Sequence, residues 1–215
     1  MKKKFQKSLW GFIAFVFVLT TVLQPVGATQ EKLNYVALGD SIPAGYMPDK
    51  TLDDSYTDFL AGYMEGYGML GDYTNKFAVP GYHTEHLLAD LVSNKEVEGD
   101  TIESVIKEAD LITITIGAND FLSQLQRDPE AGTITLDPVV VPTTLKKVQE
   151  NVSELLKIIG QLNPDAAVYV SGYYFPFPYL NEAQKASLSV VLNGLNATLF
   201  EVATKHGATY VSLES

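Results

Sequence analysis

Cysteine is absent from this sequence of 215 residues, so neither a disulfide nor a lipid-modified amino-terminal cysteine is possible. Stability must then come from a hydrophobic core rather than from covalent cross-links. With 46% hydrophobic residues, the chain is long enough for one α/β domain with a buried core, and too short for two of ordinary size.

Basic residues are scarce as well, because 15 Lys and Arg stand against 26 Asp and Glu, which gives a formal net charge of −11. An acidic surface repels phosphate backbones and anionic membrane faces, so we expect no nucleic-acid partner. Simple solubility is an alternative reason for such a charge.

Long hydrophobic runs are lacking except over residues 9–23. Lysines precede this run and Val26-Gly27-Ala28 follows it, which is the order of a secretory signal peptide cleaved after Ala28. A transmembrane anchor is the alternative, but a bilayer span needs about 20 apolar residues and this run is shorter. We therefore expect a signal peptide over residues 1–28, one mature domain over residues 29–215, a secreted product and no stable membrane anchor. Removal of the leader removes four positive charges and no negative one, so the net charge changes from −11 to −15; the four are Lys2, Lys3, Lys4 and Lys7.

Beyond the leader, short β-rich apolar runs alternate with longer amphipathic segments, which is the pattern of βαβ units around a parallel sheet. Right-handed crossovers then give a flavodoxin-like three-layer α/β/α sandwich of about five parallel strands, with its ligand site at the carboxyl ends of the strands. The predicted strands are residues 33–38, 72–77, 111–116, 167–171 and 209–213. The predicted helices are residues 56–67, 84–91, 102–109, 143–162 and 181–206, and residues 127–142 are predicted as a surface excursion.

The helix over residues 143–162 has a clear apolar face, which predicts that it packs on the sheet. The residues of that face are Val148, Val152, Leu155, Leu156 and Ile159.

A serine follows the first predicted strand, in Gly39-Asp40-Ser41-Ile42-Pro43-Ala44-Gly45. Its place on a turn at the ligand-binding edge suits a nucleophile. A helix N-cap serine is one alternative. A phosphate-binding loop is another, but Pro43 contributes no N–H where a phosphate cradle needs consecutive donors.

Two further candidates follow the next strands at the same edge. The third predicted strand ends in Gly117-Ala118-Asn119-Asp120, and the Asn119 amide is a neutral donor suited to developing negative charge. The second leads to Ala78-Val79-Pro80-Gly81, where Gly81 can bring a bare backbone N–H close to a substrate. Taken singly, Gly81 is an ordinary turn residue and Asn119 an ordinary loop cap.

With these residues in place, the sequence resembles the GDSL/SGNH hydrolase family, in its secreted bacterial lipase and acylhydrolase branch, from about residue 33 to the carboxyl end. Ser41 matches the nucleophile of the first family block, with Ile42 in place of the usual leucine, while Gly81 and Asn119 match the second and third blocks. The resemblance implies an oxyanion hole built from the Ser41 and Gly81 backbone N–H groups and the Asn119 side chain. It implies a loop-ordering role for Asp120.

The fourth block of the family, Asp-x-x-His, supplies the general base and the aspartate that orients it. No such block is found up to Ser215, so the hydrolase domain is expected to be incomplete at its carboxyl end. His206 ends a helix at the amino edge of the sheet, too far from Ser41 to act as the base. His83 lies at the correct edge and remains a possible substitute, whereas a metal pair of His83 and His86 lacks a third ligand.

These observations favour a serine ester hydrolase acting through a Ser41 acyl-enzyme on a small-molecule ester or lipid, as a monomer and without a metal or organic cofactor. The aromatic segment 173–179 either lines an acyl pocket or packs on the domain. The alternative function is a catalytically impaired remnant of the family or a ligand-binding relative. A flavodoxin-like cofactor binder would need a phosphate loop that the sequence does not contain.

Overall fold

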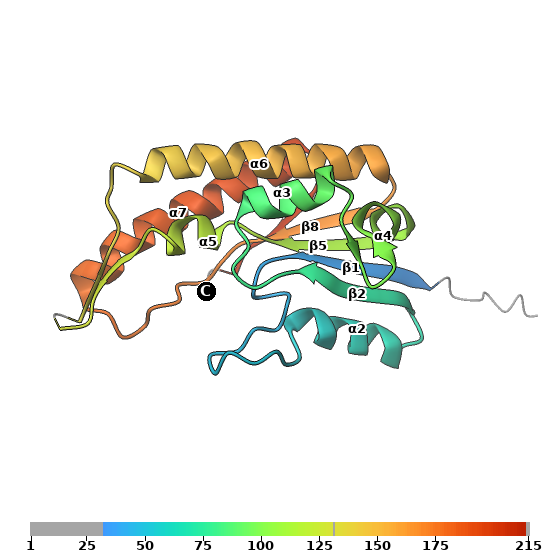
Figure 1. Ribbon diagram of the computed structural model, residues 1–215, viewed down its shortest axis with the longest axis horizontal. Helices are drawn as coiled ribbons and strands as arrows, with labels where there is room; N and C mark the ends of the chain where they lie inside the picture. Colours follow the sequence, from blue (N-terminus) through green and yellow to red (C-terminus); the bar gives the residue numbers. More distant parts are fainter. Residues whose placement is uncertain (1–31, 131, 214–215) are drawn as a thin grey trace, which may run out of the picture. The chain divides into compact units, whose positions relative to one another are not determined.

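The computed structural model describes residues 32–130 and 132–213, which include one compact unit that begins at Lys32 (Figure 1). The predicted signal peptide over residues 1–28 lies outside the described residues. A five-stranded parallel sheet with the strand order β2-β1-β5-β8-β9 forms the centre of this unit. Its strands are β1 (Leu33–Gly39), β2 (Leu70–Ala78), β5 (Leu111–Thr115), β8 (Ala167–Ser171) and β9 (Thr209–Val211).

Helices cover both faces of the sheet, so the predicted three-layer sandwich of about five parallel strands is confirmed (Figure 1). One face packs into the main core with α3 (Thr84–Val92), α4 (Ile102–Glu108), α6 (Val141–Leu162) and α7 (Glu182–Lys205). The opposite face packs Tyr35 and Ala37 of β1 against Ala61 and Met64 of α2 (Tyr56–Gly66). Because successive side chains of β1 point to opposite faces of the sheet, the strand contributes residues to two separate hydrophobic cores.

Helix α6 shows why the periodicity predicted these elements well. All five residues of its predicted apolar face are buried in the main core. Its start was predicted two residues too late, because Pro142 was placed in the preceding excursion, whereas proline is well tolerated in the first helical turn.

Several short elements were not predicted. Helix α5 (Ala118–Leu122) is too short to show a period, and it begins directly after Gly117, which has a φ of 125°. The predicted surface excursion contains an antiparallel hairpin of β6 (Gln126–Asp128) and β7 (Thr133–Thr135). A second small ladder joins β3 (Glu96–Val97) to β4 (Asp100–Thr101).

Helix α7 is long and apolar enough to cross a membrane by length and composition, with 24 residues and a mean hydropathy of 1.3 over an 18-residue stretch. Leu195, Leu199 and Val202 on this helix are buried in the main core. The core therefore accounts for the apolar residues on one side of the helix.

Candidate active site

The turn that carries Ser41 is held against the neighbouring strand by a close backbone approach. Gly39 pairs with Thr115 in the parallel register of β1 and β5, and a Cβ at Gly39 would lie 2.0 Å from the Thr115 carbonyl oxygen. Only glycine fits there, and its φ of 140° also disfavours other residues. The Asp40 N–H donates to the Thr115 carbonyl at 3.0 Å, and the Tyr46 N–H donates to the Ser41 carbonyl at 2.9 Å. Ser41 is half-buried on this hydrogen-bonded turn at the carboxyl edge of the sheet.

Asp40 connects this turn to the segment after β8. Its carboxylate is almost completely buried and accepts hydrogen bonds from the Ile42 N–H at 3.0 Å and the Tyr173 hydroxyl at 2.6 Å. Burial raises the pKa of Asp40 to about 6, although both hydrogen bonds favour the charged form. Tyr173 is in turn fixed by Asn196 of α7, whose side chain accepts from the Tyr173 N–H and donates to its carbonyl, both at 2.9 Å.

Asn119 lies in the first turn of α5, just beyond the strand β5 that pairs with β1. Its Nδ2 donates one hydrogen bond to the Tyr82 carbonyl at 2.9 Å. Because a side-chain amide has two N–H groups, this contact orients the side chain and leaves the second N–H available to another acceptor. Asn119 and Ser41 line the same pocket, so the structure brings these two predicted residues together.

Gly81 lies on the segment between β2 and α3, next to the Tyr82 carbonyl that Asn119 contacts. Its φ is 85°, its surroundings are open, and it does not itself line the pocket. The adjacent Tyr82 side chain is fixed through its hydroxyl, which donates to Asp90 Oδ2 at 2.8 Å and accepts from Lys95 Nζ at 2.7 Å.

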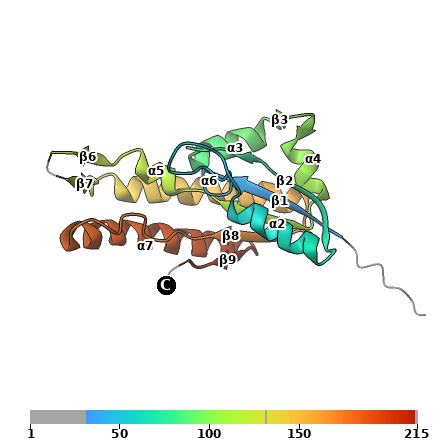
Figure 2. The same cartoon turned by 90° about the horizontal axis from the view of Figure 1, so that it is seen from below.

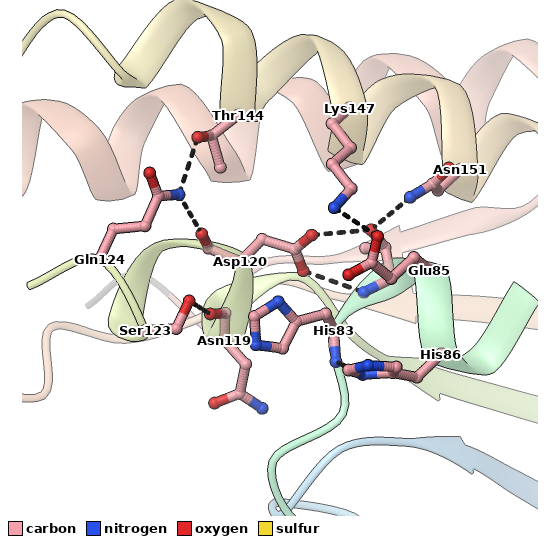
Figure 3. Close-up of polar contacts among 11 residues, drawn as sticks. His83, Glu85, His86, Asn119, Asp120, Ser123, Gln124, Thr144, Lys147 and Asn151 are labelled. Atoms are coloured by element: carbon pink, nitrogen blue, oxygen red, sulfur yellow. Dashed lines mark hydrogen bonds and ion pairs between the residues drawn. The ribbon is translucent and has the colours of Figure 1, made fainter.

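Asp120 orders the start of α3 (Figure 3) and is not among the residues that line the pocket. Its two carboxylate oxygens accept hydrogen bonds from the Thr84 N–H and hydroxyl, both at 2.9 Å, and the Asn151 side chain donates to the same hydroxyl. Figure 3 shows the side chains of Asn119 and Asp120 pointing away from each other, although they are neighbours on α5. These contacts agree with the loop-ordering role expected for Asp120.

A predominantly apolar pocket opens beside Ser41 and Asn119, between α5, the hairpin, α7 and the segment after β8. Residues 173–177 of the aromatic segment line it, which favours the pocket interpretation of that segment over simple packing. Its apolar wall is completed by Phe121, Leu122, Leu125, Leu136, Leu188, Val191, Leu192 and Leu195.

None of the described residues that line this pocket is a histidine. His206 is the C-cap residue of α7, and its Nε2 lies 2.7 Å from Ser153 Oγ of α6. His83 is the N-cap residue of α3, and its N–H donates to His86 Nδ1 at 3.0 Å. Within residues 32–130 and 132–213, no three His, Cys, Asp or Glu side chains come together as a metal site.

Sequence reasoning did not find the contact between Tyr173 and Asp40 on the turn that carries Ser41, nor the contact between Asn196 and Tyr173. Tyr173 and Asp40 are 133 positions apart, and Asn196 occurs in a helix whose pattern predicts only core packing. A polar residue on the buried face of α7 was the available signal, since buried amides need partners.

A parallel sheet with a serine and an asparagine beside one pocket at its carboxyl edge is the arrangement of the SGNH hydrolase fold. The chain belongs to the GDSL-like lipase/acylhydrolase family, which it matches over residues 37–215. By family it is therefore a hydrolase of ester substrates.

Solved structures of this fold are similar to the chain at low sequence identity. An extracellular lipase from Streptomyces rimosus has a TM-score of 0.59 at 21% identity, with 85% of this chain and 80% of that one covered. Phospholipase A1 from Streptomyces albidoflavus has a TM-score of 0.59 at 19% identity, with 83% and 78% covered. A lipase/acylhydrolase from Enterococcus faecalis has a TM-score of 0.53 at 24% identity, with 84% and 76% covered. No curated protein sequence gives a significant match.

Proposed function

We propose that the protein is a serine hydrolase of acyl esters that works through a Ser41 acyl-enzyme. The observation that carries this proposal is the shared pocket of Ser41 and Asn119, in which the amide is already oriented by the Tyr82 carbonyl. A preorganised neutral donor beside a nucleophile costs little reorganisation when negative charge develops.

In the proposed reaction, Ser41 Oγ attacks the ester carbonyl and transfers its proton to a base. The carbonyl oxygen becomes an oxyanion, which accepts hydrogen bonds from the Ser41 N–H and the free N–H of Asn119. The family resemblance adds the Gly81 N–H as a third donor, although Gly81 is not among the residues that line the pocket. The alcohol then leaves with a proton, and water attacks the acyl-enzyme to release the acid and restore Ser41. The family resemblance assigns the base to a histidine of an Asp-x-x-His block, and His83 is the substitute candidate within the described residues.

The pocket supports an acyl chain as the group bound beside Ser41. Its wall is predominantly apolar, and burial of apolar surface contributes about 0.8 kcal/mol for each CH₂ group. An acetylated sugar would leave this wall unfilled and would require polar contacts instead. The predicted signal peptide over residues 1–28 supports action outside the cell.

A chain-length series of p-nitrophenyl esters tests this function. We expect kcat/KM to rise from the acetate to longer acyl groups. We also expect Ser41→Ala to lower kcat/KM by at least about 10³-fold. Val191→Trp should narrow the pocket and lower the ratio of long-chain to acetate activity, while Val92→Trp, on α3 outside the pocket, should leave that ratio unchanged. Equal activity of Ser41→Ala and the wild type would contradict the proposal.

A second candidate is binding of an acyl ligand without turnover, which is favoured by the lack of a histidine among the described residues that line the pocket. It predicts that a fatty acid binds the protein and that no p-nitrophenyl ester is hydrolysed faster than in the buffer alone.

A further inference from the structure

An apolar surface continues outward from the pocket. It runs along the segment that follows the hairpin and along the first half of α7. Leu136 and Val191 line both the acyl pocket and a second depression, so the two are continuous. Figure 2 shows the hairpin and the start of α7 extending on the same side beyond the strands of the central sheet. The other residues of the second depression are Pro138, Val141, Pro142, Ser187 and Val190.

Large apolar side chains on and around this surface are open to solvent. Val190 is 72% exposed on α7, Val139 is 79% exposed beside Pro138, and Tyr179 is 99% exposed on the loop that lines the pocket. Leu122 and Tyr174 line the pocket and are also exposed. We call these five residues the pocket rim. Of these, Val190 lines the depression continuous with the pocket, while Val139 and Tyr179 are close in sequence to lining residues. Single exposed apolar residues are common, but a group beside an apolar pocket is typical of an interaction site.

The charges beside the rim do not favour an anionic partner. Lys185 pairs with Glu182 at 3.1 Å, and Asp137 accepts a hydrogen bond from the Val139 N–H. Attraction to anionic lipids requires clustered Lys and Arg, and the net charge of the protein is −11. A neutral or zwitterionic apolar surface is therefore the partner that fits.

We propose that the pocket rim docks the protein onto the surface of a zwitterionic lipid aggregate, from which an acyl chain enters the pocket. This inference rests on the proposed function, because an ester with a chain long enough to fill the pocket is poorly soluble and collects in aggregates. Tyr174 and Tyr179 suit such a boundary, since a tyrosine ring has an apolar body and a polar tip.

Co-sedimentation with phosphatidylcholine vesicles tests the docking, using protein collected from the culture medium in the form in which it leaves the cell. The wild type should bind, Val190→Asp should weaken binding at least tenfold, and phosphatidylglycerol vesicles should bind no better. Val92→Asp is the matched control, because Val92 is 71% exposed on a helix but lies on α3, away from the rim. Tyr179→Ser, at a fully exposed position, should also weaken binding and cannot disturb the core.

Ser41→Ala should bind vesicles as the wild type does, so a failure of the proposed chemistry and a failure of docking give different results. The inference is overturned if the wild type does not bind, or if Val92→Asp weakens binding as much as Val190→Asp. It is likewise overturned if Phe59→Asp, at an exposed position on α2, weakens binding while Val190→Asp does not. It is also overturned if the protein is a dimer that Val190→Asp dissociates, because the rim would then cover a second copy.

Discussion

The buried carboxylate of Asp40 joins the turn that carries Ser41 to the segment after β8. This carboxylate accepts hydrogen bonds from the Ile42 N–H on its own turn and from the Tyr173 hydroxyl, and it is almost completely buried. Burial raises its pKa from 3.8 to about 6, so the fold favours the neutral form relative to the unfolded chain.

This shift predicts how the stability contributed by Asp40 depends on pH. A folded-state pKa above the unfolded value gives a contribution that is present in full below pH 3.8 and is lost as the pH rises through about 6. Relative to Asp40→Asn, the wild type should therefore lose roughly 2–3 kcal/mol of unfolding free energy between pH 3.5 and pH 7, at 1.36 kcal/mol for each pKa unit. Urea unfolding of both proteins at the two pH values measures this difference. A pH-independent difference would show that the Asp40 pKa is not raised.

Asn119 is expected to act on the transition state alone. Asn119→Ala should lower kcat by about 10²–10³ with a nearly unchanged KM, as for other single oxyanion donors. Steady-state kinetics on a p-nitrophenyl ester measure both constants. A tenfold rise in KM at constant kcat would instead make Asn119 a substrate-binding residue.

His83 is the histidine whose role remains to be tested by substitution. If the base is the histidine of an Asp-x-x-His block, His83→Ala should keep the rate within about threefold of the wild type, because general base catalysis is worth 10²–10⁴-fold and would not be lost. Loss of activity in His83→Ala, with His86→Ala as the control, would make His83 the base.

The start of α3 depends on one buried carboxylate from α5. Asp120→Ala would leave the buried Thr84 N–H without its acceptor, so it should lower the unfolding free energy by about 1–3 kcal/mol. Glu85→Ala provides the matched control in the same helical turn, because Glu85 forms an exposed ion pair with Lys147 that is worth at most about 1 kcal/mol. Urea unfolding compares the two variants. Equal losses would mean that Asp120 has no special role in holding this helix.

Long elements could be predicted from the sequence because burial of one face requires apolar residues at a regular spacing. The five buried residues of α6 show this spacing. Short elements such as α5 and the hairpin have too few residues to show a period, and their formation depends on tertiary contacts. The placement of Ser41 and Asn119 beside one pocket followed from parallel strand order, since both follow strands that end at the same edge. The contact between Tyr173 and Asp40 depends on how α7 positions the segment after β8, which no local pattern reveals.

Among the residues that the structure describes, no strand pairs with the outer side of β9, which pairs with β8 and carries the exposed side chains of Val211 and, just beyond it, Leu213. Exposed apolar edge strands pair readily with other chains. Val211→Lys should therefore reduce concentration-dependent aggregation, which light scattering during incubation at fixed protein concentration would detect. Thr209→Lys, on the same strand, is a control for added charge without removal of an apolar side chain. Equal aggregation of the wild type and Val211→Lys would show that this edge is not the site of association.

The central claim is that Ser41 is the nucleophile, and identification of the serine that reacts with a fluorophosphonate tests it most directly. Ser153 is the internal comparison, because its Oγ already contacts His206 Nε2 at 2.7 Å, although it lies outside the pocket. After incubation of the protein with the probe, peptide mass spectrometry should find the adduct on Ser41, and Ser41→Ala should remain unlabelled. An adduct on Ser153, or equal labelling of Ser41→Ala and the wild type, would contradict the account.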